Sequence, residues 1–509
     1  MFPARLLTLA AAVLAATVLV PASAAAERPN ILFIYTDDQG PWAVSAEGTP
    51  QVRTPNIDRI FHEGARLARA FVATPVCSPA RANIEASRYG TEVGITDWIN
   101  PRSEPELGLD PKIATWPKLL AKAGYATGLV GKWHLGTADR FHPTKMGYGY
   151  FMGFRSGGTR VKGATLEVDG KPQKFDGFTV NVLTDHAIAF LRKNQGRPLA
   201  LAVHYRAPHA PWLPLPDEDW SAFEKLDSRL PEPDHPHLRV EHLKRVWREY
   251  LGSVASVDRS VGRLLAVLDE LGLEGKTVVI FTSDHGYNIS HHALMYKGNA
   301  HWMLQKSALP PATEFVPAIR RPNMFDTSIR VPAAVRWPGV IKPGTVVEDV
   351  VLNLDWFPTL LAMAGVELPD GVKIHGRNFV PLLKGRKIPG WSNEFYAEYS
   401  MHHGATTHMR TWRTPKWKLI RDFRDRGRDE LYNLEKDPGE TKNLIHDSRE
   451  EVRRVIAELH GKIVARMREI GDPALELTAR KNPRRSCRSR RQVSLSPAAP
   501  CGVPRLPPR

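Results

Sequence analysis

The chain has 509 residues, of which 42% are hydrophobic, so it is long enough for one large domain and a smaller one. Its formal net charge of +16 overstates the charge of the body, because nine of the Lys and Arg residues and no acid fall in residues 479–509. We therefore infer no nucleic-acid partner. The three cysteines, Cys77, Cys487 and Cys501, exclude a fold that depends on a set of disulfides.

Residues 1–26 have the pattern of a secretory signal peptide. Arg5 supplies a positive start, residues 6–20 are apolar, and "ASAAA" offers a small-residue cleavage site. The alternative is an uncleaved single membrane anchor, for which this apolar stretch is short and weakly flanked. No later stretch is apolar over the length that spans a bilayer. We expect a protein that is exported to the periplasm or the extracellular space, without stable membrane insertion.

Strand and helix patterns alternate along the body of the chain. "NILFIYTDDQG" is an apolar strand that ends in two acids, and a helix from about Trp116 to Ala123 precedes a strand that ends in Lys-Trp-His. Residues 197–212 form a strand followed by a His-rich loop, and residues 249–286 form a long amphipathic helix and a strand ending in Asp-His-Gly. This alternation indicates an α/β fold on a largely parallel sheet.

The C-terminal tail, residues 479–509, has a composition that cannot bury a core and is typical of disorder. Its basic residues could bind an acidic surface, but a solvated extension is the simpler interpretation. A Cys487–Cys501 bridge in this tail would stabilise no core. Cys77 therefore has no partner in the body of the chain, and we interpret its role as chemical rather than structural.

Seven ionisable residues follow directly after predicted strands: Asp37, Asp38, Lys132, His134, His209, Asp284 and His285. In open α/β sheets, ligands bind beyond the carboxyl ends of the strands, so these side chains are expected on one face. Three neighbouring carboxylates raise one another's pKa unless a cation neutralises them.

A divalent cation would solve this problem of charge. Oxygen ligands from Asp37, Asp38 and Asp284 favour a hard ion, Ca²⁺ or Mg²⁺, and His285 softens that preference slightly. The surrounding positive charge suits a tetrahedral oxyanion substrate, a sulfate or phosphate ester. The residues that supply it are Arg81, Lys132, His134, His209 and Lys297.

Several motifs occur in the order typical of one enzyme family. They are "RPNILFIYTDDQG", Cys-x-Pro-x-Arg at 77–81, "GKWHLG" at 131–136, "PHAPW" at 208–212, "TSDHG" at 282–286, "IRVPAAVRWPG" at 329–339 and "ELYNLEKDPGETKNL". From about residue 29 to 447, the chain resembles the sulfatase family of the alkaline phosphatase superfamily. It is similar to members related to iduronate and choline sulfatases.

The resemblance implies that Cys77 is oxidised after translation to formylglycine by a formylglycine-generating or maturase enzyme. The hydrated aldehyde, a gem-diol, would supply one oxygen to attack sulfur and a second to expel sulfate. One divalent cation, Ca²⁺ before Mg²⁺, would be bound by Asp37, Asp38, Cys77, Asp284 and His285. The catalytic residues implied are Cys77, Arg81, Lys132, His134, His209 and Lys297, and the substrate-binding residues are Lys297, His209 and, in reserve, Arg321.

The resemblance also implies the architecture. We expect a catalytic domain at 27–390, whose large mixed, mostly parallel sheet is sandwiched by helices. A smaller α+β domain at 391–478 should combine a short antiparallel sheet, including "WKLIRDF" and "DELYNL", with a helix from about 448 to 470. The period of apolar residues supports that helix, with Val452, Val455, Ile456, Leu459, Ile463, Val464 and Met467 along one face.

The chain departs from the family pattern at three places. Glu85-Ala86-Ser87 replaces the usual Leu-Thr-Gly after the core motif, which bears on how completely Cys77 is converted. The usual lysine nine residues before the arginine of "IRVP" is Arg321, whereas Lys297 occupies the position of the substrate lysine in iduronate-like and choline-like members. Ala80, often Ser in the family, is a milder change.

The function expected is hydrolysis of a sugar, aryl or small alkyl sulfate. The alternatives are a phosphatase or phosphonate monoester hydrolase of the same superfamily and an inactive binding protein with the same fold. Selectivity should come from the loops at 214–240 and 301–318. Trp212, Trp220 and Trp302 could stack on a sugar ring, although loop tryptophans more often pack onto their own domain.

Overall fold

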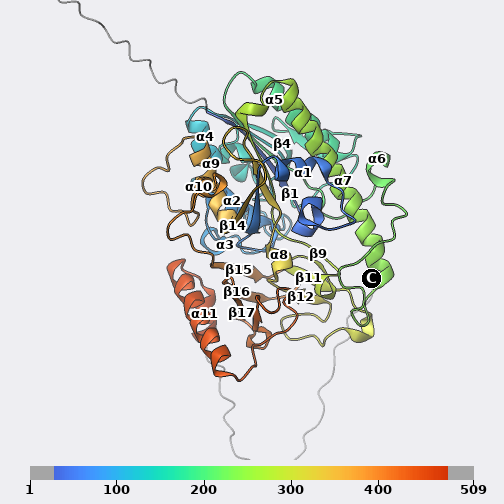
Figure 1. Ribbon diagram of the computed structural model, residues 1–509, viewed down its shortest axis with the longest axis vertical. Coiled ribbons are helices and arrows are strands. Elements are labelled where there is room, and N and C mark those ends of the chain that lie inside the picture. Colours follow the sequence, from blue (N-terminus) through green and yellow to red (C-terminus); the bar gives the residue numbers. More distant parts are fainter. Residues whose placement is uncertain (1–27, 480–509) are drawn as a thin grey trace, which may run out of the picture.

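The computed structural model describes residues 28–479, so the expected signal peptide and the tail from residue 480 lie outside it. Its main feature is a ten-stranded sheet in the order β14-β2-β13-β8-β1-β7-β3-β4-β5-β6 (Figure 1). The strands are β1 Asn30–Thr36, β2 Ala65–Phe71, β3 Ala126–Lys132, β4 Tyr150–Phe154, β5 Thr165–Val168, β6 Lys171–Lys174, β7 Leu199–His204, β8 Thr277–Ser283, β13 Ala333–Arg336 and β14 Thr345–Leu352.

The centre of this sheet is parallel. β1 pairs in parallel with β7 and β8, and β3 pairs in parallel with β7 and β4. β13 joins β8 and β2 in antiparallel pairing, and β5 and β6 form an antiparallel edge. The sheet is therefore mixed and mostly parallel at its centre, as expected. The carboxyl ends of β1, β3, β7 and β8 lie at one edge.

Alternate residues of β1 face two separate apolar layers. Ile31, Phe33 and Tyr35 contact one layer and Leu32 and Ile34 the other, as the two-residue period of a strand requires. The first layer contains the helices α2 Cys77–Ala86, α4 Trp116–Lys122, α9 Trp356–Met363 and α10 Val380–Leu383. The second contains α1 Pro55–His62, α5 Thr179–Asn194 and α7 Val240–Glu270.

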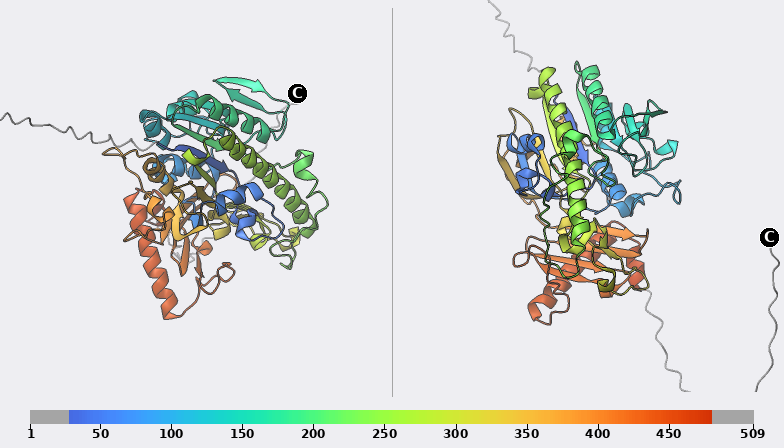
Figure 2. Two further views of the ribbon diagram at one scale, coloured as in Figure 1. Left: turned by 45° about the horizontal axis from the view of Figure 1, so that its top comes forward. Right: turned by 90° about the vertical axis from the view of Figure 1, so that its right-hand side faces the viewer.

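A smaller antiparallel sheet lies at one end of the molecule beside α11 (Figures 1 and 2). Its strands are β15 Phe395–Met401, β16 Thr407–Arg413, β17 Trp417–Asp422 and β18 Glu430–Asn433. α11 spans Glu450–Glu469, close to the expected range, and its buried residues are Val452, Leu459, Ile463 and Met467. Val455, Ile456 and Val464 pack partly buried at the edge of the same face.

A third sheet is formed by the segment between β8 and β13 of the large sheet. It consists of the short strands β9 Asn288–Ile289, β10 Leu294–Tyr296, β11 Asn299–Trp302 and β12 Arg320–Pro322. The remaining short helices are α3 Gly90–Val93, α6 Asp217–Trp220, α8 Asp326–Ile329 and α12 Ala474–Ala479. Among the helices of residues 28–479, we find none with the length and apolar character that crossing a bilayer requires.

Candidate active site

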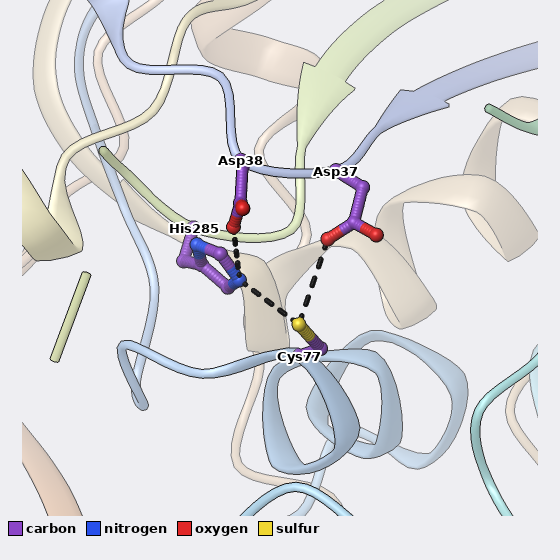
Figure 3. A group of neighbouring side chains, drawn as sticks. All are labelled: Asp37, Asp38, Cys77 and His285. Carbon is purple, nitrogen blue, oxygen red and sulfur yellow. Dashed lines mark hydrogen bonds and ion pairs between the residues drawn. The ribbon is translucent and has the colours of Figure 1, made fainter. Parts of the chain in front are cut away.

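Four side chains converge beyond the strand ends: Asp37, Asp38, Cys77 and His285 (Figure 3). One potential ligand atom from each lies within 4.8 Å of those from the other three, and all four residues are buried. Cys77 Sγ lies 3.5 Å from Asp37 Oδ1 and 3.4 Å from His285 Nε2. His285 Nε2 lies 3.4 Å from Asp38 Oδ1.

The fold places these residues through the ends of two adjacent parallel strands. Asp37 and Asp38 follow β1, where Asp38 turns the chain with a left-handed φ of 69°. Asp284 and His285 follow β8, and the Asp284 carboxylate accepts a hydrogen bond from the Asp38 amide at 3.2 Å. Cys77 is the first residue of α2, which faces the same edge of the sheet.

Each carboxylate of the cluster has its own cationic partner. Lys132 Nζ lies 2.5 Å from Asp37, and Lys297 Nζ binds Asp38. Arg81 donates two bonds, of 3.2 and 3.0 Å, to one oxygen of Asp284. These contacts bring together the candidate residues from four distant parts of the sequence.

The pKa values of the cluster reflect this balance of charge. Burial acts to raise the pKa of Asp37, but Lys132 and other cations hold it well below its usual value. Burial and Asp37 raise the pKa of Asp284 to about 7. Burial and Asp37 also act to raise the pKa of the Cys77 thiol, but Lys132, Lys297 and His285 outweigh them and lower it to about 6.

The donor set fits one divalent cation. Asp37, Asp38 and His285 supply two oxygens and a nitrogen within ligand range of one another, beside residue 77. The second oxygen of Asp284 lies 3.3 Å from His285 Nε2, although its partner oxygen is taken by Arg81. Burial, and then the charge of Asp37, raises the pKa of Asp284, and a bound cation would favour its ionised form.

Two histidines stand at the wall of a cavity of about 510 Å³ that reaches Cys77 and Lys297. His134 Nε2 lies 3.1 Å from the Ile99 carbonyl, so it donates there, and its buried Nδ1 has no hydrogen-bond partner. Burial, then Lys132, lowers the pKa of His134, which keeps the ring neutral. His209 Nε2 lies 3.7 Å from Asp38, and its Nδ1 lies 2.6 Å from the Ala210 carbonyl.

The outer lining of the cavity differs from the loops expected to set selectivity. It consists of Trp98, Ile99, Asn100, Pro101, Arg102, Ser156, Gly157, Gly158 and Asn299. Trp212, Trp220 and Trp302 instead pack on a separate apolar cluster that includes Tyr250. These three tryptophans therefore pack onto their own domain.

Arg321 is not brought to the cavity. Its guanidinium binds Glu430 and lies over the Phe325 ring, 5.2 Å from the ring centroid. It does not line the cavity that Cys77 and Lys297 share. Lys297 contacts the cluster instead: its Nζ lies 3.3 Å from Cys77 Sγ.

His204, the last residue of β7, lies beside the cluster but is not among the site residues predicted from the sequence. Its Nδ1 lies 3.1 Å from the Lys132 carbonyl and 3.4 Å from Arg81 Nη1, so it packs behind the cluster. The rule that identified the other residues, a polar side chain at a strand end, also applies to His204. The Trp98–Arg102 lining carries no such signal, because it lies in an irregular loop.

Glu85, where the sequence departs from the family pattern, is buried in α2. One of its oxygens accepts the Tyr148 hydroxyl at 2.7 Å, and the other is buried without a hydrogen-bond partner. Burial raises the pKa of Glu85 to about 8, and the Tyr148 hydrogen bond and Arg81 offset this only in part. The carboxyl is therefore mostly protonated at neutral pH.

This burial predicts a pH dependence of stability. The usual pKa of a glutamate is near 4.5, so between about pH 4.5 and pH 8 the folded state binds more protons at Glu85 than the unfolded state. The free energy of unfolding should therefore fall as pH rises through that window, by an amount on the order of a few kcal/mol. Glu85→Gln should remove this slope in urea denaturation between pH 5 and pH 8, whereas Glu224→Gln, at an exposed position, should keep it. Parallel pH profiles for Glu85→Gln and the parent would contradict the expectation.

The mixed sheet, with carboxylates, an imidazole and a cysteine clustered beyond its strand ends, has the alkaline-phosphatase-like fold. The family model described as Sulfatase matches residues 29–366, and the model described as N-sulphoglucosamine sulphohydrolase, C-terminal, matches residues 320–469. The chain belongs to the sulfatase family and is a sulfuric ester hydrolase.

Curated relatives agree with this assignment. The N-acetylglucosamine-6-O-sulfatase of Bacteroides thetaiotaomicron is 26% identical over 528 residues, which cover 87% of each chain. The steryl-sulfatase of Rattus norvegicus is 30% identical over 433 residues, 73% of each chain. Among solved structures, a protein in complex with its substrate D-glucosamine-2-N,6-O-disulfate has a TM-score of 0.73 at 23% identity, covering 88% of this chain and 99% of that one.

Proposed function

We propose that this chain cleaves the sulfate ester of a sugar, an aryl alcohol or a small alkyl alcohol after Cys77 has been oxidised to formylglycine. The observation that carries the proposal is the position of Cys77, which lines the cavity while its Sγ contacts Asp37, His285 and Lys297. A modifying enzyme acts as a partner during biosynthesis, and the signal-peptide pattern supports export.

Asp37, Asp38, Asp284 and His285 would hold one divalent cation, Ca²⁺ in preference to Mg²⁺, beside residue 77. When bound, that cation supplies Lewis-acid activation of the attacking oxygen and neutralises charge on the sulfate group. The three carboxylates favour a hard ion, and flexible ligand geometry suits Ca²⁺ better than Mg²⁺. Arg81 holds Asp284 in place through two bonds to one oxygen.

The positions of the other residues suit them to bind the sulfate group, orient a metal ligand or transfer a proton. Lys297 lies beside both residue 77 and Asp38, where its ammonium can bind a sulfate oxygen. Lys132 orients Asp37. His134, neutral and with an unpartnered Nδ1, is suited to accept a proton from residue 77 in the step that releases sulfate.

His209 is suited to protonate the leaving oxygen. It lines the cavity, and its Nε2 lies 3.7 Å from Asp38. Within residues 28–479, His134, the other cavity histidine, has no such contact with a carboxylate of the cluster. Burial lowers the pKa of His209 in the free protein, and a bound sulfate group favours its charged form. Lys297 and His209 together would therefore bind the sulfate and assist departure of the alcohol.

Sulfate and phosphate release from matched substrates tests the reaction class. We expect hydrolysis of nitrophenyl sulfate in the presence of Ca²⁺, at a kcat/KM well above that for nitrophenyl phosphate under the same conditions. A preference for the phosphate would favour the phosphatase alternative. Absence of both activities in protein whose residue 77 is fully converted would favour a binding protein.

His209→Ala should distinguish substrates by their leaving groups. A basic alkoxide needs its proton in the transition state, whereas nitrophenolate leaves without help, so general-acid loss affects the first far more. We expect kcat/KM to fall about 10²-fold or more for an alkyl or sugar sulfate and less than about tenfold for nitrophenyl sulfate. The control is His134→Ala, which should slow both substrates alike. An equal loss on both substrates for His209→Ala would refute the acid role.

A further inference from the structure

The gene encodes a thiol at position 77, and a thiolate is a different metal ligand from the hydroxyl of a hydrated aldehyde. We infer that the chain with unmodified Cys77, here called the thiol form, is a tetrahedral site for a thiophilic divalent ion, Zn²⁺ in particular. The ion would be bound by Asp37, Asp38, Cys77 and His285. This inference extends the site of the proposed function, but it requires only the encoded thiol and not its conversion.

The distances between donor atoms carry the inference. Zinc bonds of about 2.3 Å to sulfur and about 2.0–2.1 Å to nitrogen or oxygen place tetrahedral donors about 3.5 Å apart when one is sulfur and about 3.3 Å apart otherwise. Cys77 Sγ lies 3.5 Å from Asp37 Oδ1 and 3.4 Å from His285 Nε2, and His285 Nε2 lies 3.4 Å from Asp38 Oδ1. Three edges of the donor set therefore match a zinc tetrahedron.

The chemical types of the four donors also favour zinc over calcium. Calcium takes six to eight oxygen ligands, whereas two carboxylates, one imidazole and one thiolate form the mixed set that zinc accepts. His285 Nδ1 lies 3.0 Å from the Gly286 carbonyl, a contact that orients the ring with Nε2 toward the other donors. Replacement of sulfur by oxygen at residue 77 would make the same site oxygen-rich and shift its preference toward a hard ion.

Lys297 competes with a metal for this site. Its Nζ binds Asp38 and lies 3.3 Å from Cys77 Sγ, so an incoming ion must displace the ammonium from both. Binding forms a metal–sulfur bond to the Cys77 thiolate, and any proton still on the sulfur passes to the buffer, with no change of oxidation state. Removal of the Lys297 charge should therefore tighten binding of zinc, although it impairs binding of an anionic substrate.

Cobalt serves as the spectroscopic probe of the thiol form. The protein should be prepared with Cys487→Ser and Cys501→Ser, so that Cys77 is its only thiol, and its conversion state measured by mass. One equivalent of Co²⁺ should give a near-ultraviolet thiolate-to-metal band and intense visible bands of a tetrahedral ion, and Zn²⁺ should abolish them. Cys77→Ser, a nearly isosteric change, should lack the near-ultraviolet band while Co²⁺ still binds.

A second group of potential ligands in the described residues supplies the matched control. Asp97, His402 and His403 also lie within ligand range of one another. There, however, Asp97 accepts the backbone amides of both histidines, and Glu104 accepts both imidazoles. The His402→Ala/His403→Ala variant should keep the cobalt bands of the parent, and loss of the bands in this variant would overturn the inference.

The affinities of the thiol form for Zn²⁺ and Ca²⁺ provide a second test of the zinc site. In the thiol form, Zn²⁺ should bind at least on the order of 100-fold more tightly than Ca²⁺. Lys297→Met should tighten Zn²⁺ about tenfold by removing the competing charge. Equal affinities for the two ions, or Co²⁺ bound without a thiolate band, would overturn the inference. Neither outcome bears on the proposed function, which is tested by sulfate release from the converted protein.

Discussion

Replacing Cys77 with alanine is expected to lower kcat/KM for sulfate esters by a factor on the order of 10⁴ or more, because the variant has no side-chain oxygen that can attack sulfur. The fold should persist, since Cys77 Sγ makes polar contacts with Asp37, His285 and Lys297 at a cavity wall. Sulfate release and the urea unfolding midpoint measure the two effects. The Cys487→Ser/Cys501→Ser double variant, which changes the cysteines outside the described residues, should keep full activity.

Cys77→Ser tests whether the second hydroxyl of the gem-diol is needed for repeated turnover. A serine hydroxyl can attack sulfur, but it has no second hydroxyl on the same carbon with which to expel sulfate. We expect at most one product molecule per enzyme molecule in a burst experiment. Repeated turnover of Cys77→Ser at the parent rate would show that the proposed nucleophile is wrong for this protein.

Removal of the metal is expected to have the second large effect. Chelation should abolish activity and Ca²⁺ or Mg²⁺ should restore it, because the carboxylates and the imidazole clustered beside residue 77 are placed to hold a cation that activates the attacking oxygen. Asp37→Asn should lower kcat/KM by about 10³-fold or more, since it removes one anionic ligand and leaves Lys132 buried without its partner.

Metal content separates this effect from simple unfolding. Asp37→Asn should lose bound metal by elemental analysis while its far-ultraviolet circular dichroism stays that of the parent. Asp97→Asn, which alters a buried carboxylate outside the cluster, should retain the metal. Full activity in excess chelator, with no metal left on the protein, would contradict a metal-dependent mechanism.

Much of the fold could be predicted from local patterns. The apolar run of β1 and the amphipathic period of α7 and α11 identify a parallel sheet, a covering helix and a C-terminal helix. Because the carboxyl ends of parallel strands meet at one edge, Asp37, Lys132 and Asp284 could be placed together from sequence alone. The structure brings these residues into one cluster.

What the sequence could not predict depends on contacts between distant irregular segments. The loop at 97–104 lines the cavity and is held by the Asp97 and Glu104 contacts to His402 and His403, about three hundred residues later in the chain. No periodicity marks such a pairing. The spacing of the family motif offers Arg321 as a second substrate-binding residue, but in the structure Arg321 pairs with the Glu430 carboxylate of another strand.

The chemical state of residue 77 in active protein distinguishes a formylglycine enzyme from one that uses a thiol. Mass spectrometry of the tryptic peptide that spans residues 70–81 distinguishes the thiol from the aldehyde. We expect an aldehyde at residue 77, with specific activity proportional to the aldehyde fraction across preparations made with and without a modifying enzyme. Fully active protein that contains only the thiol would contradict this expectation.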